Sequence, residues 1–455
     1  MPDFSSTFLE EATGGTWSGS EPDDLSGICF DARQLQPGEC FVALSGGARD
    51  GHEFVRQARE KGARAAITER RLDIDIPQLI VSDSLVAMGA IGRSVRHAFI
   101  PPVIGITGSC GKTSTKEILR LLLGTDRTHA TAGNWNNRIG VPMTLFELDE
   151  TKQDFAIVEA GINQPGEMDL LGKMIAADVT ILTNIGLAHL ELLGSRDGIA
   201  FEKARLAEFA VKGSPLILPA DALRYSAIKL MLDRCVVLAG ETEIVPDGVR
   251  RVVRFSSELT GDVSRKFSLG EKEYTVRSPS EGIAANAALA LIAAEELGIA
   301  PEESAERLLL WRPESYRGRV VAAGDSFFYI DCYNANPSSM ADALSAFVHA
   351  APKEMARCYV LGAMNELGFA AEEMHESIGR MLNLQAQDLV FFVGPDSLSE
   401  SYRKGAFEAG ASETQLISAE NISLIESAVA EFQGALFLKG SRSYQLEKLL
   451  PESII

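Results

Sequence analysis

Short apolar runs alternate with longer stretches of helical periodicity along most of this chain. Between residues 100 and 185, apolar runs at residues 103–107, 154–158 and 179–182 each pass directly into glycine or polar residues. Apolar runs of this length, bounded by turn-forming residues, are typical of buried strands, and the helical stretches between them favour parallel pairing. The pattern therefore predicts an α/β protein built on parallel sheets.

Two breaks in this pattern divide the chain into three expected domains, at residues 1–98, 99–311 and 312–455. The first break is Phe-Ile-Pro-Pro at 99–102, because paired prolines fit into neither neighbouring element. The second is Trp-Arg-Pro at 311–313. In the first domain we expect a small α/β unit with strands at 28–30, 40–44, 65–68 and 79–81 and a helix over 53–61. In the third we expect a second, Rossmann-like sheet with strands at 327–330, 359–361, 389–393 and 435–438. The central domain should also contain a β-rich stretch over 244–277 and a buried helix over 286–297.

The clearest chemical signal lies where the strand at 103–107 ends. There the sequence reads Gly-Ser-Cys-Gly-Lys-Thr-Ser over residues 108–114, followed by a helical pattern with Ile118, Leu119, Leu121 and Leu122 on one side. A strand, a glycine loop carrying Lys112 and Thr113, and a helix together form a phosphate cradle. Backbone N–H groups and the helix N-terminus meet the phosphates, the lysine adds charge, and the threonine reaches Mg²⁺. The match to a P-loop is incomplete, because Ile106 stands where the first glycine is expected.

Polar residues follow other strands of the central domain in the same way. Glu159 and Asn184 lie just beyond expected strands, and His189 follows soon after. Ligands of open α/β sheets bind beyond the carboxyl ends of the strands, so a carboxylate and a histidine here suggest Mg²⁺ coordination beside the phosphate loop. Taken singly, Glu159 could be a helix cap and His189 a surface imidazole. Polar clusters also follow strands of the third domain, at 331–337, 362–366 and 439–443, and indicate a site on that sheet as well.

Charge and cysteine content narrow the function. The formal net charge of −20 argues against a nucleic acid or an anionic membrane as the main partner. The six cysteines are scattered without metal or disulfide spacing, as in a reduced cytoplasmic protein. We find no signal sequence and no apolar run long enough to span a membrane. We therefore expect a cytoplasmic protein with small-molecule partners and no membrane insertion.

Together these motifs resemble the Mur ligase family over nearly the whole chain. The similar segments are ITGSCGKTSTKE at 106–117, TAGNWNNRIGVPMTL at 131–145, EAGINQPGEMDLL at 159–171, TNIGLAHLELLGSRDGIAFEKA at 183–204, GRV at 318–320, DCYNANPSSM at 331–340, LGAMNELG at 361–368 and KGSRS at 439–443. A phosphate loop without its first glycine is a trait of Mur and folylpolyglutamate ligases. The resemblance implies a three-domain Mur ligase architecture and an ADP-forming ligase of peptidoglycan precursor synthesis. This ligase would add D-alanyl-D-alanine to UDP-N-acetylmuramoyl-tripeptide through an acyl phosphate.

The resemblance also implies roles for individual residues. Domain 1–98 would bind the UDP substrate, 99–311 would bind ATP, and 312–455 would bind the dipeptide. The nucleotide would contact Gly108, Ser109, Cys110, Gly111, Lys112, Thr113, Ser114, Asn286, Arg319 and Asp331, with Arg319 stabilising the transferring phosphate. One Mg²⁺ would be held by Thr113 and Glu159, and a second by His189 and a Lys203 carbamylated by CO₂. The UDP-muramoyl substrate would contact Arg33, Asp50, Gly51, His52, Asn136 and Asn137. The dipeptide would lie against Asn334, Asn336, Lys439 and Arg442.

Some positions depart from the family pattern. Ala32 stands where a serine is usual, Ala363 where an aspartate is usual, and Ile283 where an asparagine would face the adenine. Two alternatives stay open, namely the ligase that adds the third peptide residue and a nucleotide-binding module without catalysis. The motifs YNANPSSM and GNWNNRIGVP argue against the first alternative, and the retained Lys112, Glu159, His189 and Lys203 argue against the second. We expect a monomer. The third residue of the tripeptide, lysine or diaminopimelate, stays open, as does the open or closed arrangement of the domains.

Overall fold

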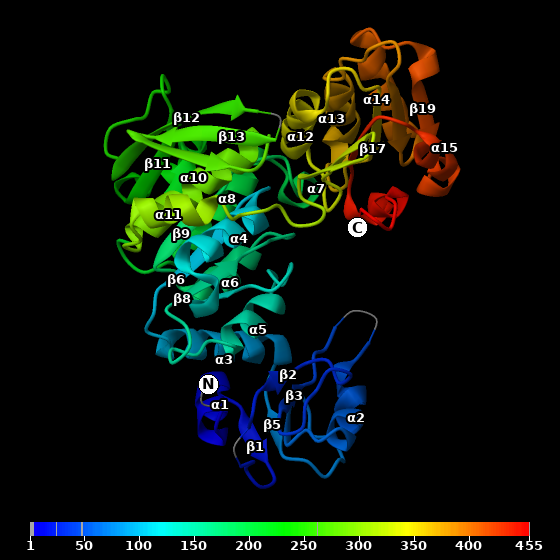
Figure 1. The fold of residues 1–455 in the computed structure, drawn as a ribbon. Coiled ribbons are helices and arrows are strands. Elements are labelled where there is room, and N and C mark those ends of the chain that lie inside the picture. Colours follow the sequence, from blue (N-terminus) through cyan, green and yellow to red (C-terminus); the bar gives the residue numbers. More distant parts are fainter. Residues whose placement is uncertain (1–3, 24, 47–48, 262, 455) are drawn as a thin grey trace.

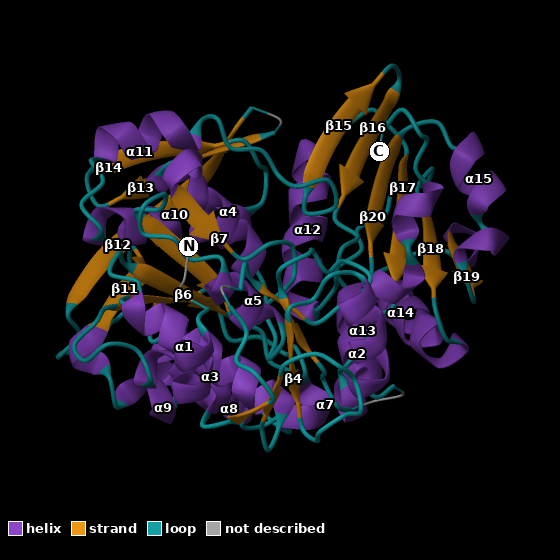
Figure 2. Cartoon of the chain, turned by 90° about the horizontal axis from the view of Figure 1, so that it is seen from below, coloured by secondary structure: helices purple, strands orange, loops and turns teal. Residues whose placement is uncertain are grey.

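The computed structural model describes residues 4–23, 25–46, 49–261 and 263–454, and the described strands form three separate sheets along the chain (Figure 1). Each sheet is mainly parallel and carries helices, as the alternating pattern predicts. Viewed from the side of the N-terminal domain, the central and C-terminal sheets lie next to each other (Figure 2). All six cysteines are free, in agreement with their scattered spacing.

The N-terminal sheet has the strand order β1-β5-β4-β3-β2, in which β1 alone is antiparallel to its neighbour. Its strands are β1 (Thr16–Ser18), β2 (Ile28–Cys29), β3 (Cys40–Val42), β4 (Ala65–Thr68) and β5 (Gln78–Ile80). Its helices are α1 (Ser6–Thr13), α2 (Val55–Glu60) and α3 (Ser84–Ala98). Helix α3 packs on the central domain, where the buried Arg96 pairs with Asp178 at 2.7 Å and donates to the carbonyls of Ile175 and Ala176. The N-terminal domain is thus anchored through its last helix.

The central sheet has the order β14-β13-β12-β11-β10-β9-β6-β8-β7, parallel from β7 to β12 and antiparallel beyond. Its strands are β6 (Val103–Thr107), β7 (Thr128–Ala130), β8 (Phe155–Glu159), β9 (Val179–Leu182), β10 (Leu216–Pro219), β11 (Cys235–Gly240), β12 (Arg251–Thr260), β13 (Ser264–Leu269) and β14 (Lys272–Val276). Its helices are α4 (Lys112–Leu123), α5 (Gly140–Phe146), α6 (Glu167–Ile175), α7 (Leu190–Leu193), α8 (Arg196–Glu208), α9 (Ser226–Lys229), α10 (Glu281–Glu296) and α11 (Pro301–Leu308). Strand β6 lies between β8 and β9, so the loops after these three strands meet at one edge of the sheet.

Helices α4 and α10 form one core with this sheet. Ile118, Leu119 and Leu122 of α4 are buried against Ile104 and Ile106 of β6 and against the apolar face of α10. Helix α10 is apolar nearly all round, which suits a helix enclosed by its neighbours. It begins at Glu281, five residues before the expected start at 286, because Ser280 caps it by accepting from the Ile283 N–H.

The C-terminal sheet has the order β15-β16-β20-β17-β18-β19, and only the β15–β16 pair is antiparallel. Its strands are β15 (Arg319–Ala323), β16 (Ser326–Ile330), β17 (Arg357–Gly362), β18 (Leu389–Val393), β19 (Leu416–Ala419) and β20 (Ala435–Lys439). Its helices are α12 (Pro337–Ala350), α13 (Ala371–Gly379), α14 (Asp396–Glu408) and α15 (Glu426–Glu431). The expected Rossmann-like arrangement is present, and the loops after β16, β17 and β20 face the central domain.

Candidate active site

The phosphate loop after β6 keeps its shape through contacts that exclude larger side chains. A Cβ on Gly108 would lie 1.8 Å from Thr183 Oγ1, and a Cβ on Gly111 would lie 2.5 Å from Asn286 Oδ1. Both glycines also have positive φ angles, +154° and +80°. The Asn184 side chain, at the end of β9, accepts from the N–H groups of Ser109 (3.0 Å) and Cys110 (2.9 Å). The N–H groups in the first turn of α4 have no acceptors within the helix. The loop positions this turn so that these groups can bind an anion.

Two lysine amines share one carbonyl of this loop. Lys112 Nζ donates to Gly108 O at 2.9 Å, and Lys203 Nζ donates to the same oxygen at 3.1 Å. Burial lowers the pKa of the Lys112 ammonium, and the nearby Arg317 guanidinium lowers it further while Glu159 opposes the effect. Burial also holds the pKa of Lys203 well below its ordinary value, and the charge of Lys112 adds to this. Lys203 therefore lies behind the loop, 2% exposed, where burial disfavours its charged form.

Thr113 and Glu159 come together as the strand order predicts. Glu159, at the end of β8 and 1% exposed, accepts from Thr113 Oγ1 at 3.0 Å and from Asn136 Nδ2 at 2.7 Å. A buried carboxylate bonded only to neutral donors, next to a hydroxyl and a phosphate loop, fits a hard divalent cation. In the part of the chain that the structure describes, no group of three or more His, Cys, Asp or Glu side chains is arranged to hold a metal. Water molecules and substrate oxygens would complete the coordination of such an ion.

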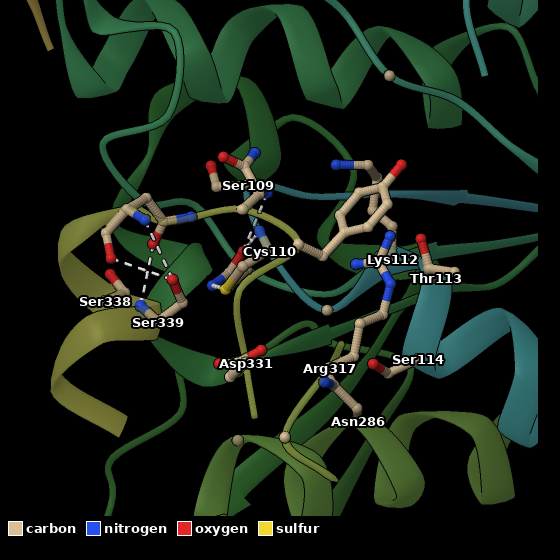
Figure 3. Close-up of a pocket in the computed structure, with 18 of the residues that line it drawn as sticks. Ser109, Cys110, Lys112, Thr113, Ser114, Asn286, Arg317, Asp331, Ser338 and Ser339 are labelled. Carbon is tan, nitrogen blue, oxygen red and sulfur yellow. Dashed lines mark hydrogen bonds between the residues drawn. The ribbon is translucent and has the colours of Figure 1, made fainter. Parts of the chain in front are cut away.

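These residues line one wall of a cavity of about 590 Å³ between the central and C-terminal domains (Figure 3). The opposite wall comes from the C-terminal domain. There Lys439, 1% exposed, forms an ion pair with Asp331 and donates to the Asn334 carbonyl at 3.2 Å. Asn336 caps α12 by accepting from the Ser339 N–H at 2.9 Å, and its side chain also lines the cavity. The predicted clusters on two different sheets therefore form a single site.

Two contacts between carboxylates and the central domain hold these walls together. Asp342 of α12 accepts from Ser280 Oγ at 2.6 Å and from the Gly282 N–H at 2.9 Å, so it caps α10 from the neighbouring domain. Glu366, after β17, pairs with His189 Nδ1 at 2.6 Å. The hydrogen bond from His189 lowers the pKa of the Glu366 carboxyl. Both residues of this second pair have positive φ angles, 60° at His189 and 64° at Glu366. Residues other than glycine rarely adopt this conformation, because it strains the backbone.

The structure does not bring every expected residue into the cavity. The expected residues that line it are Ser109, Cys110, Gly111, Lys112, Thr113, Ser114, Asn136, Asn137, Glu159, His189, Asn286, Asp331, Asn334, Asn336 and Lys439. Those outside its lining are Gly108, Lys203, Arg319, Arg442, Arg33, Asp50, Gly51 and His52. Arg442 forms an ion pair with Glu447 instead. The amide of Asn286 lies against Gly111, at the phosphate end of the cavity. The buried Ile283 lies on the same helix, nearer to its N-terminus.

Arg319, the arginine of the motif at 318–320, lies outside the lining of the cavity. It begins the edge strand β15, and its Nη1 donates to the Ile454 carbonyl at 3.1 Å, away from the cavity. Arg317, two residues earlier, lines the cavity in its place. Side chains two residues apart in an extended strand would point the same way, but Gly318 between them has a φ of +75° and turns the chain. The phosphate role expected of Arg319 stays a prediction, and in this structure Arg317 is the neighbouring arginine that lines the cavity.

The expected uridine-binding residues lie in the N-terminal domain, where they bond mainly to neighbouring residues of that domain. Arg33 pairs with Asp31, while Asp50 pairs with Arg70 and accepts from His52 Nδ1 at 2.6 Å. The other ring nitrogen of His52 accepts from the Glu69 N–H at 2.9 Å. The imidazole, which is 3% exposed, therefore joins the segment at Asp50 to the segment at Glu69. A link to the cavity exists through Phe30, whose ring lies 5.7 Å from that of Trp135.

Sequence reasoning missed several residues of the cavity, above all Arg317 and Asp342. Asp342 lies within α12 and has no motif of its own. Arg317 was adjacent to a recognised motif, and the neighbouring tyrosine at 316 and glycine at 318 were the available signs of a turn.

Comparisons with known proteins agree with this architecture. Three family models match: "Mur ligase family, catalytic domain" over residues 24–100, "Mur ligase middle domain" over 106–294 and "Mur ligase, glutamate ligase domain" over 316–442. The UDP-N-acetylmuramoyl-tripeptide–D-alanyl-D-alanine ligase of Treponema pallidum is 32% identical, over 94% of this chain and 93% of its own. The crystal structure of MurF from Acinetobacter baumannii is similar with a TM-score of 0.84 and 30% identity, over 99% of this chain and 98% of that one. The MurF ligase of Thermotoga maritima, solved in complex with ADP, has a TM-score of 0.78 and 26% identity, over 93% and 96% of the two chains.

Proposed function

This chain belongs to the Mur ligase family, and we propose that it joins D-alanyl-D-alanine to UDP-N-acetylmuramoyl-tripeptide with hydrolysis of ATP to ADP and phosphate. The observation that carries this proposal is the single cavity in which a phosphate loop faces the asparagine-rich wall of the C-terminal domain. The relatives named as this ligase cover nearly the whole chain. Because its substrates are ATP and a nucleotide-linked precursor, we place the enzyme in the cytoplasm, and we propose that it acts as a monomer.

The residues of the cavity account for the first chemical step. The carboxylate at the end of the tripeptide attacks the γ-phosphorus of ATP, the bond to the β-γ bridging oxygen breaks, and ADP leaves. Both reactants are anionic, so Lys112 and the N-terminus of α4 must offset their repulsion. Thr113 and Glu159 would hold a first Mg²⁺, and His189 with a carbamylated Lys203 a second. Such ions, when bound, neutralise the charge on the phosphate oxygens.

The second step needs the C-terminal domain. The free amine of the dipeptide attacks the acyl carbon of the acyl phosphate, a tetrahedral intermediate forms, and phosphate leaves as the amide bond is made. Water would hydrolyse the acyl phosphate, so the reaction requires an enclosed site. Two contacts connect the walls of the cavity, one between Asp342 and the start of α10 and one between Glu366 and His189.

One assay tests the proposed function. ATP-dependent phosphate release is measured with each UDP-muramoyl precursor in combination with single amino acids and with dipeptides. We expect turnover only with a UDP-tripeptide together with D-alanyl-D-alanine, and the preferred third residue, lysine or diaminopimelate, is read from the same matrix. Turnover with a UDP-dipeptide and a single amino acid would instead identify the ligase that adds the third residue.

The position of Asn334 leads to a prediction about the dipeptide. Its Oδ1 accepts from the Ala335 N–H at 2.8 Å while the side chain lines the C-terminal wall. We expect Asn334→Ala to raise KM for D-alanyl-D-alanine about tenfold, the effect of one lost hydrogen bond to a charged group, and to leave KM for the UDP-tripeptide unchanged. Asn336→Ala is less selective, because it also removes the cap of α12. If both KM values rise together for Asn334→Ala, the residue supports the wall and does not bind the dipeptide.

A further inference from the structure

Lys116 is a buried lysine that takes no part in the proposed chemistry. It lies on α4, one turn after Lys112, its side chain is 1% exposed, and it is outside the lining of the cavity. We propose that Lys116 is a positioning residue, which holds the loop at residues 131–137 in the shape that binds the UDP-muramoyl precursor. This inference rests on the proposed function and adds a residue that acts on the site from behind the loop.

The Lys116 ammonium holds the start of this loop by two backbone carbonyls. Its Nζ donates to Thr131 O at 2.6 Å and to Gly133 O at 3.4 Å, and it lies 3.0 Å from Glu117 Oε1. Three acceptors match the three N–H donors of an ammonium, as a buried cation requires. Two carbonyls that converge on one atom demand a tight curl of the backbone, and Gly133, with a φ of +51°, permits it. An apolar side chain could fill the same space but could not fix this curl.

The curled backbone leads directly into three asparagines that line the cavity, Asn134, Asn136 and Asn137. The position of Asn136 is narrowly defined. Its Nδ2 donates to Glu159 Oε1 at 2.7 Å, and a Cβ on Gly161 would lie 2.8 Å from its Oδ1. A small change in the curl at its start would therefore displace these amides from the cavity wall.

The chemistry of the loop favours the precursor over the nucleotide phosphates as its ligand. Amide side chains both donate and accept hydrogen bonds, which suits the hydroxyl and amide groups of a sugar-linked peptide, whereas a polyphosphate is bound by cations and N–H groups. The loop also contacts the domain expected to bind UDP, since the Trp135 ring lies 5.7 Å from that of Phe30. Lys116 thus joins α4 to the part of the central domain that faces the N-terminal domain.

The phosphate loop at 108–114 is held by different contacts. The Asn184 side chain accepts from the N–H groups of Ser109 and Cys110, and none of these atoms is bonded to Lys116. Removal of the Lys116 ammonium should therefore disturb the binding of the precursor and leave the binding of the nucleotide nearly intact.

The proposal is tested with three variants of the full-length enzyme: Lys116→Met, Gly133→Ala and Ile118→Val. Methionine keeps an unbranched stem and removes the N–H donors, while Gly133→Ala strains the same curl from the loop itself, where the space around the Cα is open. Ile118→Val removes one methylene from the buried face of the same helix and is the matched control for a loss of helix stability. We expect Lys116→Met and Gly133→Ala to raise KM for the UDP-tripeptide about tenfold, the effect of one lost hydrogen bond, with KM for ATP nearly unchanged. Ile118→Val should keep both KM values.

Hydrogen exchange followed by mass spectrometry reports on the loop without any ligand. Lys116→Met should speed the exchange of the amides at 131–137 about tenfold, and Ile118→Val should not. Equal rises in both KM values, unchanged exchange of the loop in Lys116→Met, or a wild-type KM for the precursor in Gly133→Ala would overturn the assignment. If the wild type turns over no UDP-muramoyl precursor, the proposed function fails, and the exchange comparison still decides whether Lys116 holds the loop.

Discussion

Lys112→Ala should reduce turnover by more than a hundredfold while the protein still folds. The lysine begins α4, its amine is held on the Gly108 carbonyl, and it is the central-domain cation that lines the cavity next to the phosphate loop. Phosphoryl transfer gathers negative charge at this point, so the stabilisation lost is greatest in the transition state. Steady-state phosphate release gives the activity, and thermal unfolding gives the stability.

Lys272→Ala is the control for this substitution, because Lys272 is an exposed lysine of β14 in the same domain. It should match the wild type in both measurements. Activity of Lys112→Ala above about a tenth of the wild type, a loss of less than about 1.4 kcal/mol of transition-state stabilisation, would contradict the phosphate role.

Lys203 should work as a carbamate, so removing CO₂ and bicarbonate should lower activity reversibly. In this modification the neutral amine attacks the carbon of CO₂, an N–C bond forms, and a proton is released. The reaction requires an unprotonated amine, and burial, which holds the pKa of Lys203 well below its ordinary value, favours that form. The product is an anion beside the Lys112 cation, so carbamylation adds an attraction that the neutral amine lacks. It would also supply oxygen ligands that an amine lacks, as a hard metal ion requires.

The test combines a variant with a direct observation. Lys203→Arg keeps a positive charge and cannot form this adduct, so its activity should fall to below about 1% of the wild type if the carbamate is needed to offset the phosphate charge. Labelling with ¹³CO₂ should give a carbamate carbon signal in the wild type that is lost in this variant, independent of activity. An active arginine variant, or no labelled carbamate in a fully active wild type, would remove Lys203 from the second metal site.

Local sequence determined the phosphate site. A short apolar strand, two glycines, Lys112 and Thr113 in succession and an amphipathic helix are all encoded within about twenty residues, so few long-range contacts are needed to specify them. The meeting of Thr113 with Glu159 also followed from the sequence. Parallel strands end at a common edge, and β6 and β8 are neighbours in the sheet. The motifs likewise identified the Mur ligase family.

Strands β10, β11 and β19 were not among the expected strands, for two different reasons. Strands β10 and β11 are buried apolar runs like those that were predicted, so the sequence carried their signal. Strand β19 has a weak local pattern, since it is a short edge strand with both exposed and buried positions, and such a strand depends on its neighbour in the sheet more than on its own residues. The first turn of α10 was missed for a related reason. It contains Gly282, whose lack of a Cβ admits Asp342 from another domain.

The sequence by itself therefore determined the three-part α/β architecture, the phosphate loop and the strand-end residues that surround it, because each depends on periodicity or on residues close together in the chain. Only the tertiary structure decided which side chains enter the cavity. Arg317 lines the cavity and Arg319 does not, because Gly318 turns the backbone between them, and Glu366 reaches His189 across a domain boundary. The direction of a side chain at a turn depends on how whole domains pack. The pairing of His189 with Glu366, which lie 177 residues apart in the chain, depends on the same packing. That packing is set by the burial of many surfaces at once and leaves no local signature in the sequence.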